Sequence, residues 1–238
     1  VMTNNWTFGS SLCLGLLLLN ACTVETVDSK NVKTGGIAAS ITANATTDAA
    51  TTVIATLQVG GPDSNTYVDL SGGDKIFVVA NDKQIEMEAQ GTGTYQANVT
   101  TAAENTEFIV DLERDTEDDA PMSKGTLPAP FSFQVPNMTT SRMQDLTITW
   151  SPSGSSDDME LTLSGSCIFQ RTIDIPGDTG SHVISPGTLI STNTDKPETC
   201  DLTVEMVRSR KGTPDATFDP DSSFLLKQTR TAKFTSAP

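Results

Sequence analysis

The chain has 238 residues and a formal net charge of −15, because 30 Asp and Glu side chains face only 15 Lys and Arg side chains. Its length suits one large or two small β domains. So acidic a chain repels phosphate backbones and anionic lipid headgroups, which argues against nucleic-acid binding and against membrane attachment through charge. The acidity is uneven, since residues 25–136 hold 17 of the acidic side chains and only 6 of the basic ones.

An apolar run near the start of the chain, residues 12–19, is followed directly by Asn20, Ala21 and Cys22. The run has the length of a signal-peptide core and is shorter than the roughly 20 residues that span a bilayer. A buried strand or helix is the alternative, but the loose polar sequence that follows offers it no packing partner. We therefore expect residues 1–21 to be a signal peptide.

The four residues Leu19-Asn20-Ala21-Cys22 resemble a lipobox, the site at which bacteria attach diacylglycerol to a cysteine and cleave the chain in front of it. The resemblance implies an exported bacterial lipoprotein, held to a membrane by palmitate-type acyl chains on Cys22. Thr23 follows the cysteine where inner-membrane lipoproteins carry Asp, which by analogy implies the outer membrane. Residues 22–36 show no hydrophobic periodicity and are expected to form a flexible tether after the lipidated cysteine.

Short alternating runs of apolar and polar residues recur after the tether at about ten-residue spacing, with turn residues between them. This pattern is typical of an all-β sandwich or barrel, and no window shows a comparably strong helical period. The expected strands of the first module are 37–42, 52–59, 67–70, 75–80, 84–88, 95–99, 107–112 and 131–135. They predict an acidic β-sandwich domain over residues 37–136.

The alternation continues beyond Pro136 and predicts a second β-sandwich over residues 137–238. Its expected strands are 146–150, 159–164, 168–175, 182–184, 202–207 and 224–234. The run Ile148-Thr149-Trp150-Ser151-Pro152, with the alternation that follows it, resembles the early strands of immunoglobulin-like or fibronectin-type modules of bacterial surface proteins. The resemblance implies a core position for Trp150, between two sheets. The predicted fold class is thus all-β, with two tandem immunoglobulin-like sandwiches.

Two cysteines remain if Cys13 leaves with the signal peptide and Cys22 carries lipid. In an oxidising compartment Cys167 and Cys200 are expected to form a disulfide. Closing a loop of about 30 residues stabilises a fold by about 3–4 kcal/mol in the chain-entropy model. Two buried free thiols are the alternative. No zinc-type site is expected, because there is no second cysteine pair and His182 is the only histidine.

Acidic residues crowd the end of the expected strand 107–112 and the turn after it. They are Asp111, Glu113, Asp115, Glu117, Asp118 and Asp119. If the strand continues, the odd-numbered acids share one face, and calcium takes six to eight oxygen ligands from such loops. Calcium is therefore the one cofactor that the sequence puts forward. The alternative is a solvated acidic edge that prevents strand-to-strand aggregation.

Motifs typical of catalytic sites are missing from the sequence. It holds no Gly-x-Ser-x-Gly turn, no His-Glu-x-x-His motif and no Gly-x-x-x-x-Gly-Lys loop. We therefore expect a non-enzymatic, lipid-anchored envelope protein that binds, adheres or scaffolds through an unidentified protein or glycan. Two alternatives stay open. One is a carbohydrate-active enzyme or its accessory module, since paired carboxylates are plentiful. The other is a subunit of a secreted assembly that pairs through an exposed edge strand.

Overall fold

A computed structural model describes residues 24–238, whose regular structure is β apart from two short 3-10 turns, Ser29–Asn31 (η1) and Thr34–Gly36 (η2). The predicted all-β class is confirmed. No helix in this part of the chain has the length and the apolar character needed to cross a bilayer. The signal peptide and Cys22 lie outside the described residues, so the leader and the lipid anchor stay predictions.

Strands follow one another along the whole described chain. Those up to residue 126 are β1 (Glu25–Asp28), β2 (Ile37–Ala45), β3 (Thr51–Val59), β4 (Thr66–Asp69), β5 (Lys75–Ala80), β6 (Lys83–Glu86), β7 (Glu88–Gly91), β8 (Thr94–Val99), β9 (Glu107–Glu113) and β10 (Ala120–Thr126). The later ones are β11 (Ser132–Gln134), β12 (Thr140–Ser141), β13 (Leu146–Ser151), β14 (Asp158–Gly165), β15 (Ile168–Ile175), β16 (Ser181–Ile184), β17 (Cys200–Lys211) and β18 (Ser223–Ala237). Of these, β1, β7, β10 and β12 have no counterpart among the expected strands, since the expected strand 84–88 corresponds to β6 and reaches only the first residue of β7.

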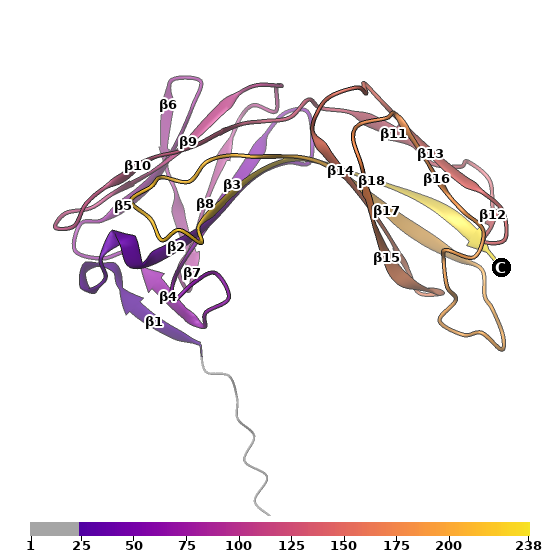
Figure 1. Cartoon of the computed structure of the whole chain (residues 1–238), viewed down its shortest axis with the longest axis horizontal. Coiled ribbons are helices and arrows are strands. Elements are labelled where there is room, and N and C mark those ends of the chain that lie inside the picture. The colour runs from indigo at the N-terminus through magenta and orange to yellow at the C-terminus, as the bar shows by residue number, and fades with distance from the viewer. Residues whose placement is uncertain (1–23) are drawn as a thin grey trace, which may run out of the picture.

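The strands form three sheets, which build an arch with a sandwich at each end (Figure 1). The largest sheet has eleven strands and runs β1-β4-β3-β2-β18-β17-β14-β15, with β7, β8 and β12 off this path. A four-stranded sheet, β10-β9-β5-β6, packs on it at one end, in the first lobe. A three-stranded sheet, β11-β13-β16, packs on it at the other end, in the second lobe.

The core of each lobe follows from strand alternation, because successive side chains of a strand point to opposite faces. In the first lobe β3 sends Val53, Ala55 and Leu57 inward, against Val78 of β5 and Val110 of β9. All five side chains are fully buried. The two sheets of the first lobe thus enclose one apolar cluster.

The second lobe has a core of its own. Leu161 and Leu163 of β14 point inward from the large sheet, and Ile148 and Trp150 of β13 point inward from the small one. Trp150 is only 5% exposed, and its indole Nε1 donates to the carboxylate of Asp178 at 2.5 Å. The tryptophan therefore packs between the two sheets, with its polar atom satisfied as a buried indole requires.

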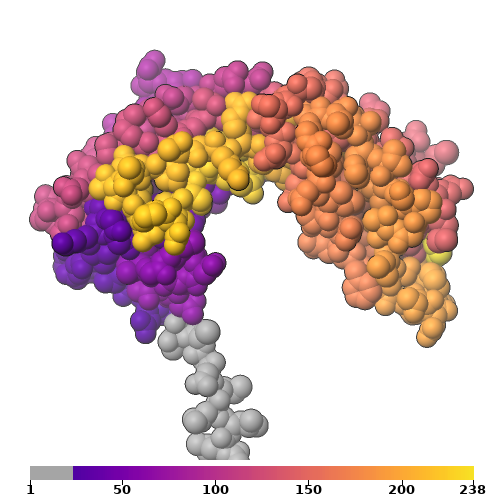
Figure 2. All heavy atoms as spheres, in the orientation of Figure 1, coloured from indigo at the N-terminus to yellow at the C-terminus, as the bar shows by residue number. Residues whose placement is uncertain are grey.

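The last strand belongs to both lobes. Residues 223–228 of β18 pair in parallel with β2 of the first lobe, and β17 accompanies β18 in antiparallel register as far as Ser236. Phe224 and Leu226 lie in the core of the first lobe, and Phe234 lies in that of the second. Figure 2 shows a late segment of the chain, in yellow, spread over the first lobe, although the C-terminus itself lies at the second lobe (Figure 1). This arrangement differs from the boundary expected at residue 136, because residues 218–228 complete the first lobe.

Residues 25–36, expected to form a flexible tether, instead pack on the first lobe. β1 pairs in parallel with β4, and the buried guanidinium of Arg114 donates to the carbonyls of Ser29 and Val32 at 2.8 and 3.0 Å. Arg114 also pairs with Asp74 at 2.8 Å. Burial alone would raise the pKa of Asp74, but hydrogen bonds from Ser29, a backbone amide and Arg114 outweigh it and hold the pKa below its ordinary value. Polar contacts fix this segment, so hydrophobic periodicity did not reveal it.

A buried arginine of β17, Arg208, lies at the joint between the lobes. Its side chain is fully buried, and its Nη atoms donate to the carbonyls of Ala129 and Pro152 at 2.9 and 2.6 Å. Nη2 lies 2.9 Å from the carboxylate of Asp178, and the guanidinium stacks over the ring of Phe131 at 4.9 Å. Burial alone would raise the pKa of Asp178, but hydrogen bonds from Trp150 and Ser155 and the charge of Arg208 lower it.

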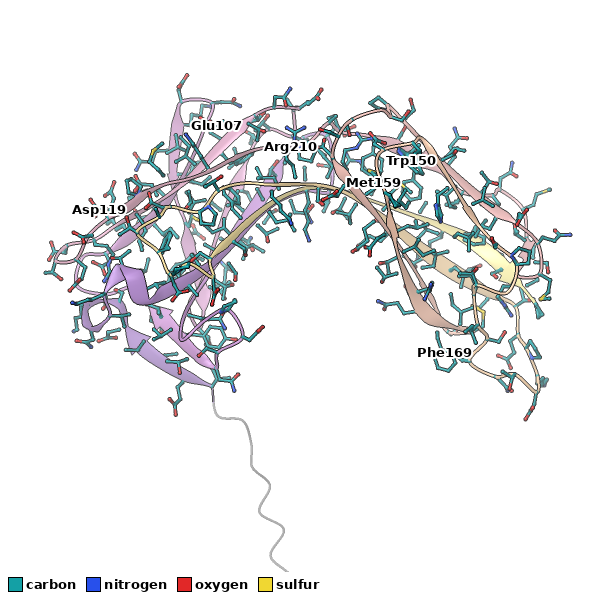
Figure 3. The ribbon with its side chains drawn as sticks, in the orientation of Figure 1. Glu107, Asp119, Trp150, Met159, Phe169 and Arg210 are labelled. Carbon is teal, nitrogen blue, oxygen red and sulfur yellow. A yellow bond between two sulfur atoms is a disulfide. The ribbon has the colours of Figure 1, made fainter. Side chains whose placement is uncertain are left out.

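A second arginine of β17 bridges the two lobes directly. Arg210 pairs with Asp157 of the second lobe through Nε at 2.7 Å and Nη2 at 3.0 Å. Its Nη1 donates to Asn105 and Thr126 of the first lobe, at 3.0 and 2.9 Å. Figure 3 shows Arg210 where the lobes meet. Bidentate arginine–carboxylate contacts are among the stronger polar contacts in proteins, and Arg210 thus links the two lobes directly.

Candidate binding surface

The acidic residues expected to bind calcium do not converge. They are Asp111, Glu113, Asp115, Glu117, Asp118 and Asp119. β9 ends at Glu113, and Arg114, the next residue, is buried on the same inward side as Val110 and Leu112. Asp119 is engaged as the acceptor of the Arg114 backbone N–H at 2.6 Å. Within residues 24–238, no group of three or more acidic, histidine or cysteine side chains is arranged to hold a metal ion. Calcium binding stays a prediction.

One of these acids is nevertheless in an unusual setting. Burial, followed by the charges of Glu113, Asp119 and Asp215, raises the pKa of Asp111. One carboxylate oxygen of Asp111 is buried and has no hydrogen-bond partner among the described residues. The carboxylate is only partly buried, and it lies beside other acids rather than in a pocket, so we assign it no site.

The predicted disulfide between Cys167 and Cys200 is confirmed. The two Cα atoms are 5.8 Å apart, and the bond ties the turn between β14 and β15 to the first residue of β17. Both cysteines lie near the free end of the second lobe. The bond therefore fixes the framework on which the loops of that end rest.

Arg142, next to the disulfide, organises the same end of the lobe. This buried side chain donates to the hydroxyls of Ser191 and Ser236, each at 3.2 Å. It also donates to the carbonyl of Glu198 at 2.9 Å and to the sulfur of Cys167 at 3.4 Å. Four of the five N–H groups of a guanidinium are thus used inside the protein. Arg142 is a positioning residue that anchors the loop at 191–198.

An apolar hollow of about 430 Å³ lies over this framework. Its apolar lining includes Met143, Leu189, Ile190, Pro197 and Pro238. Met143 and Ile190 are 70% and 58% exposed, so their side chains face solvent. Isolated apolar residues on a surface are ordinary, but several around one hollow mark an interaction site.

Phe169 extends the apolar surface because of a β-bulge. Ile168 of β15 pairs with Gly165 of β14, whereas Arg171 pairs with Leu163, so β15 carries one extra residue between them. A bulge reverses which side chains face the core. Ile168 is accordingly buried, while Phe169 is 61% exposed at the free end of the second lobe (Figure 3).

Phe169 and Ile190 are direct neighbours. The backbone N–H of Phe169 donates to the carbonyl of Ile190 at 2.9 Å, and Ile168 forms a β-bridge with Ser191. Antiparallel partners project to the same face, so the two exposed side chains lie side by side. We call the combined surface the tip patch. It consists of Met143, Phe169, Leu189, Ile190, Pro197 and Pro238.

The rim of the tip patch is acidic. The exposed loop 192–199 supplies part of the hollow's wall and carries Asp195 and Glu198 against Lys196 alone. Asp201 follows at the start of β17 and is exposed as well. Arg142 also lines the hollow, but four of its N–H groups donate to acceptors inside the protein, so the patch combines an apolar centre with an exposed edge that is mainly acidic.

A second hollow, of about 500 Å³, lies in the first lobe beside β5, β6 and β8. Its buried apolar lining is Ile76 and Met87. Two polar side chains there are already bonded: Asp74 to Arg114, and the hydroxyl of Tyr95 to the N–H of Leu70 at 2.6 Å. Burial raises the pKa of Tyr95. These two groups are committed to the fold, so the tip patch is the stronger candidate.

No protein-family model and no curated protein sequence matches the chain. Among solved structures, it aligns with a segment of two fibronectin type III domains from chicken tenascin, at 10% identity and a TM-score of 0.26, over 85% of this chain and 99% of that one. A cytokine receptor complex aligns at 11% identity and a TM-score of 0.34, over 82% and 94%. The adhesin InvE of Yersinia pseudotuberculosis aligns at 12% identity and a TM-score of 0.26, over 83% and 60%. TM-scores this low do not assign a function to the chain.

Proposed function

We propose that the chain is a lipid-anchored protein of the bacterial envelope that acts as a non-enzymatic binding, adhesion or scaffolding module. The observation that carries the proposal is the tip patch, an exposed apolar surface around a hollow at the free end of the second lobe. Surfaces of this kind bind other molecules, because covering them removes apolar area from water.

The arch supports a scaffolding role. β1, near the start of the described chain, lies in the first lobe (Figure 1), and Phe169 of the tip patch lies at the free end of the second lobe (Figure 3). An anchor at Cys22, three residues before β1, would hold the first lobe near the membrane. The polar contacts at the joint would then keep the tip patch at a fixed place relative to the anchor.

Mass spectrometry of the membrane fraction tests the anchor. We expect an N-terminus at Cys22 with added acyl mass, and we expect Cys22→Ala to move the protein out of that fraction. An uncleaved N-terminus with a free thiol at Cys22 would disprove lipid anchoring.

Site-specific photo-crosslinking in cells tests the binding function. A crosslinking amino acid placed at Met143, in the tip patch, should give a discrete crosslinked product. The same amino acid placed at Val183, which is 49% exposed on the small sheet, is the control and should give none. Equal labelling from both positions, or none from either, would contradict a binding role for the tip.

A secreted assembly that pairs through an edge strand is the second candidate, and β15 favours it. β15 pairs with β14 along one side, and on the other side only its first two residues meet residues 190–191. Its exposed edge carries one basic and one acidic residue, Arg171 and Asp174. Exposed edges can accept a further strand. Proline at Thr172 should then abolish any oligomer seen by light scattering, while a monomeric wild type would exclude this candidate.

A further inference from the structure

We infer that the tip patch takes an apolar side chain flanked by Lys or Arg, presented by a partner protein. The inference rests on the proposed binding function and specifies the chemistry of its partner. Three observations carry it: the shape and composition of the hollow, the bulge that exposes Phe169, and the acidic rim.

The hollow suits a side chain rather than a flat surface. It has a volume of about 430 Å³, and its floor includes Leu189, which is buried at 6% exposure. Interface hot spots are apolar or aromatic anchors that enter pockets and are surrounded by contacts that exclude water. Met143 and Ile190 line the hollow, and Phe169 lies next to Ile190, so these side chains supply such a surround.

The bulge in β15 changes which side chain faces the core, because it buries Ile168 and exposes Phe169. It leaves one residue out of the ladder and exposes a phenylalanine that a regular strand would place on the same face as Ile173 and Ile175. Bulges recur where a side chain must be re-aimed, often beside functional sites. Because Phe169 lies next to Ile190, the re-aimed ring enlarges the same patch.

The acidic rim selects the charge of the partner. Asp195, Glu198 and Asp201 outnumber Lys196 along the loop and the strand that follows it. The chain as a whole carries a net charge of −15. Complementary charge around an apolar anchor steers a partner and fixes its register, so the flanking residues of the occupant should be basic.

The same charge argues against two other occupants. A second copy would bring another acidic rim and another net charge of −15 against the first. Anionic lipid headgroups would be repelled in the same way. A basic protein segment gains from both the apolar centre and the rim.

Selection from a random peptide library, displayed on phage and panned on the full-length chain, tests this inference. Synthesised winners are then measured by fluorescence anisotropy. We expect them to carry an apolar residue beside Lys or Arg. We expect Ile190→Ser and Phe169→Ser each to weaken binding at least about tenfold, and Glu198→Gln to weaken it several-fold at low salt only. Val183→Ser is the matched control and should leave the affinity within about twofold.

Several results would overturn the inference. These are recovery of no peptide, recovery of acidic or uncharged peptides, or affinities that Ile190→Ser does not change. Dimers in light scattering that Ile190→Ser dissolves would assign the patch to a second copy. Flotation with phosphatidylcholine vesicles that Ile190→Ser abolishes would assign it to lipid. A tip-specific crosslink in cells alongside any of these outcomes would preserve the binding function while rejecting the basic partner.

Discussion

Replacing Arg208 with methionine is the sharpest test of the joint between the lobes. Methionine keeps much of the volume and the apolar stem but removes the guanidinium. The change deletes hydrogen bonds to the carbonyls of Ala129 and Pro152 and the ion pair with Asp178. It also deletes the stacking on Phe131.

The structure sets the size of the effect. Hydrogen bonds from charged donors contribute about 1.5–3 kcal/mol each, and breaking a buried ion pair by removing one partner costs about 3–5 kcal/mol. Two features moderate the loss. Asp178 keeps its hydrogen bonds from Trp150 and Ser155, and the Nε of Arg208 has no partner among the described residues, so its burial cost disappears. We expect Arg208→Met to lower the free energy of unfolding by about 3–5 kcal/mol.

Urea unfolding followed by tryptophan fluorescence measures this loss, because Trp150 is buried in the second lobe and bonded to Asp178. Arg171→Met on the exposed face of β15 is the control and should change the free energy by less than about 0.5 kcal/mol. Adding Asp178→Asn to Arg208→Met should recover part of the loss, since it removes the charge left without its partner. A loss below about 1 kcal/mol, or no recovery in the double variant, would refute the assigned role of Arg208.

Four further predictions follow from individual contacts. Joint replacement of Cys167 and Cys200 by Ala should lower the free energy of unfolding by about 3–4 kcal/mol, measured in urea against wild type with the disulfide intact. Gly212→Ala places a Cβ 2.7 Å from the carbonyl of Lys124 and should cost about 1–3 kcal/mol, seen as a lower Tm. Burial and neighbouring acids raise the pKa of Asp111, so its ionised form costs stability as pH rises above the ordinary value of 3.8. Asp111→Asn should therefore raise Tm at pH 7, and the gain should vanish below that value. Calcium binding at the acidic cluster predicts a higher Tm in millimolar calcium, which Asp111→Asn removes.

Alternation located most strands because it reports directly which face of a strand is buried. Thr51–Val59 shows the principle, since Val53, Ala55 and Leu57 are the expected inward residues and are fully buried. Strands without such alternation were not predicted. β1 is short and exposed, and β10 has little alternation and begins with Ala120-Pro121, so neither has a periodic signal.

Alternation does not reveal which strands pair with one another or which sheets pack together, and this limits prediction of the architecture. The run through Phe224 and Phe234 identified β18 but gave no hint that its two ends serve different cores. Arginine is usually exposed, so no sequence pattern indicated that Arg114 or Arg208 would lie in the interior. Their roles emerge only when the carbonyls and carboxylates that they bind come together in three dimensions.

The tip patch was hidden for a related reason. A regular strand over 168–175 puts Phe169 on the same face as Ile173 and Ile175, which would make it a core residue. The bulge reverses the alternation of side chains at the start of β15, so that Ile168 is buried and Phe169 is exposed. An alternating run that begins with two adjacent apolar residues, Ile168 and Phe169, is the one signal that could have raised the question.

The shared strand connects the tip patch mechanically to the first lobe. β18 has 15 residues and, at about 3.3 Å per residue, runs for about 50 Å. It pairs with β17 from Lys211 to Cys200, where the disulfide attaches the tip. A pull on a bound partner would load these two strands along their length, with their ladder bonds in shear, and would reach β2 through residues 223–228. A single strand that contributes to both cores therefore couples the two lobes mechanically, which a loop between two separate sandwiches would not do.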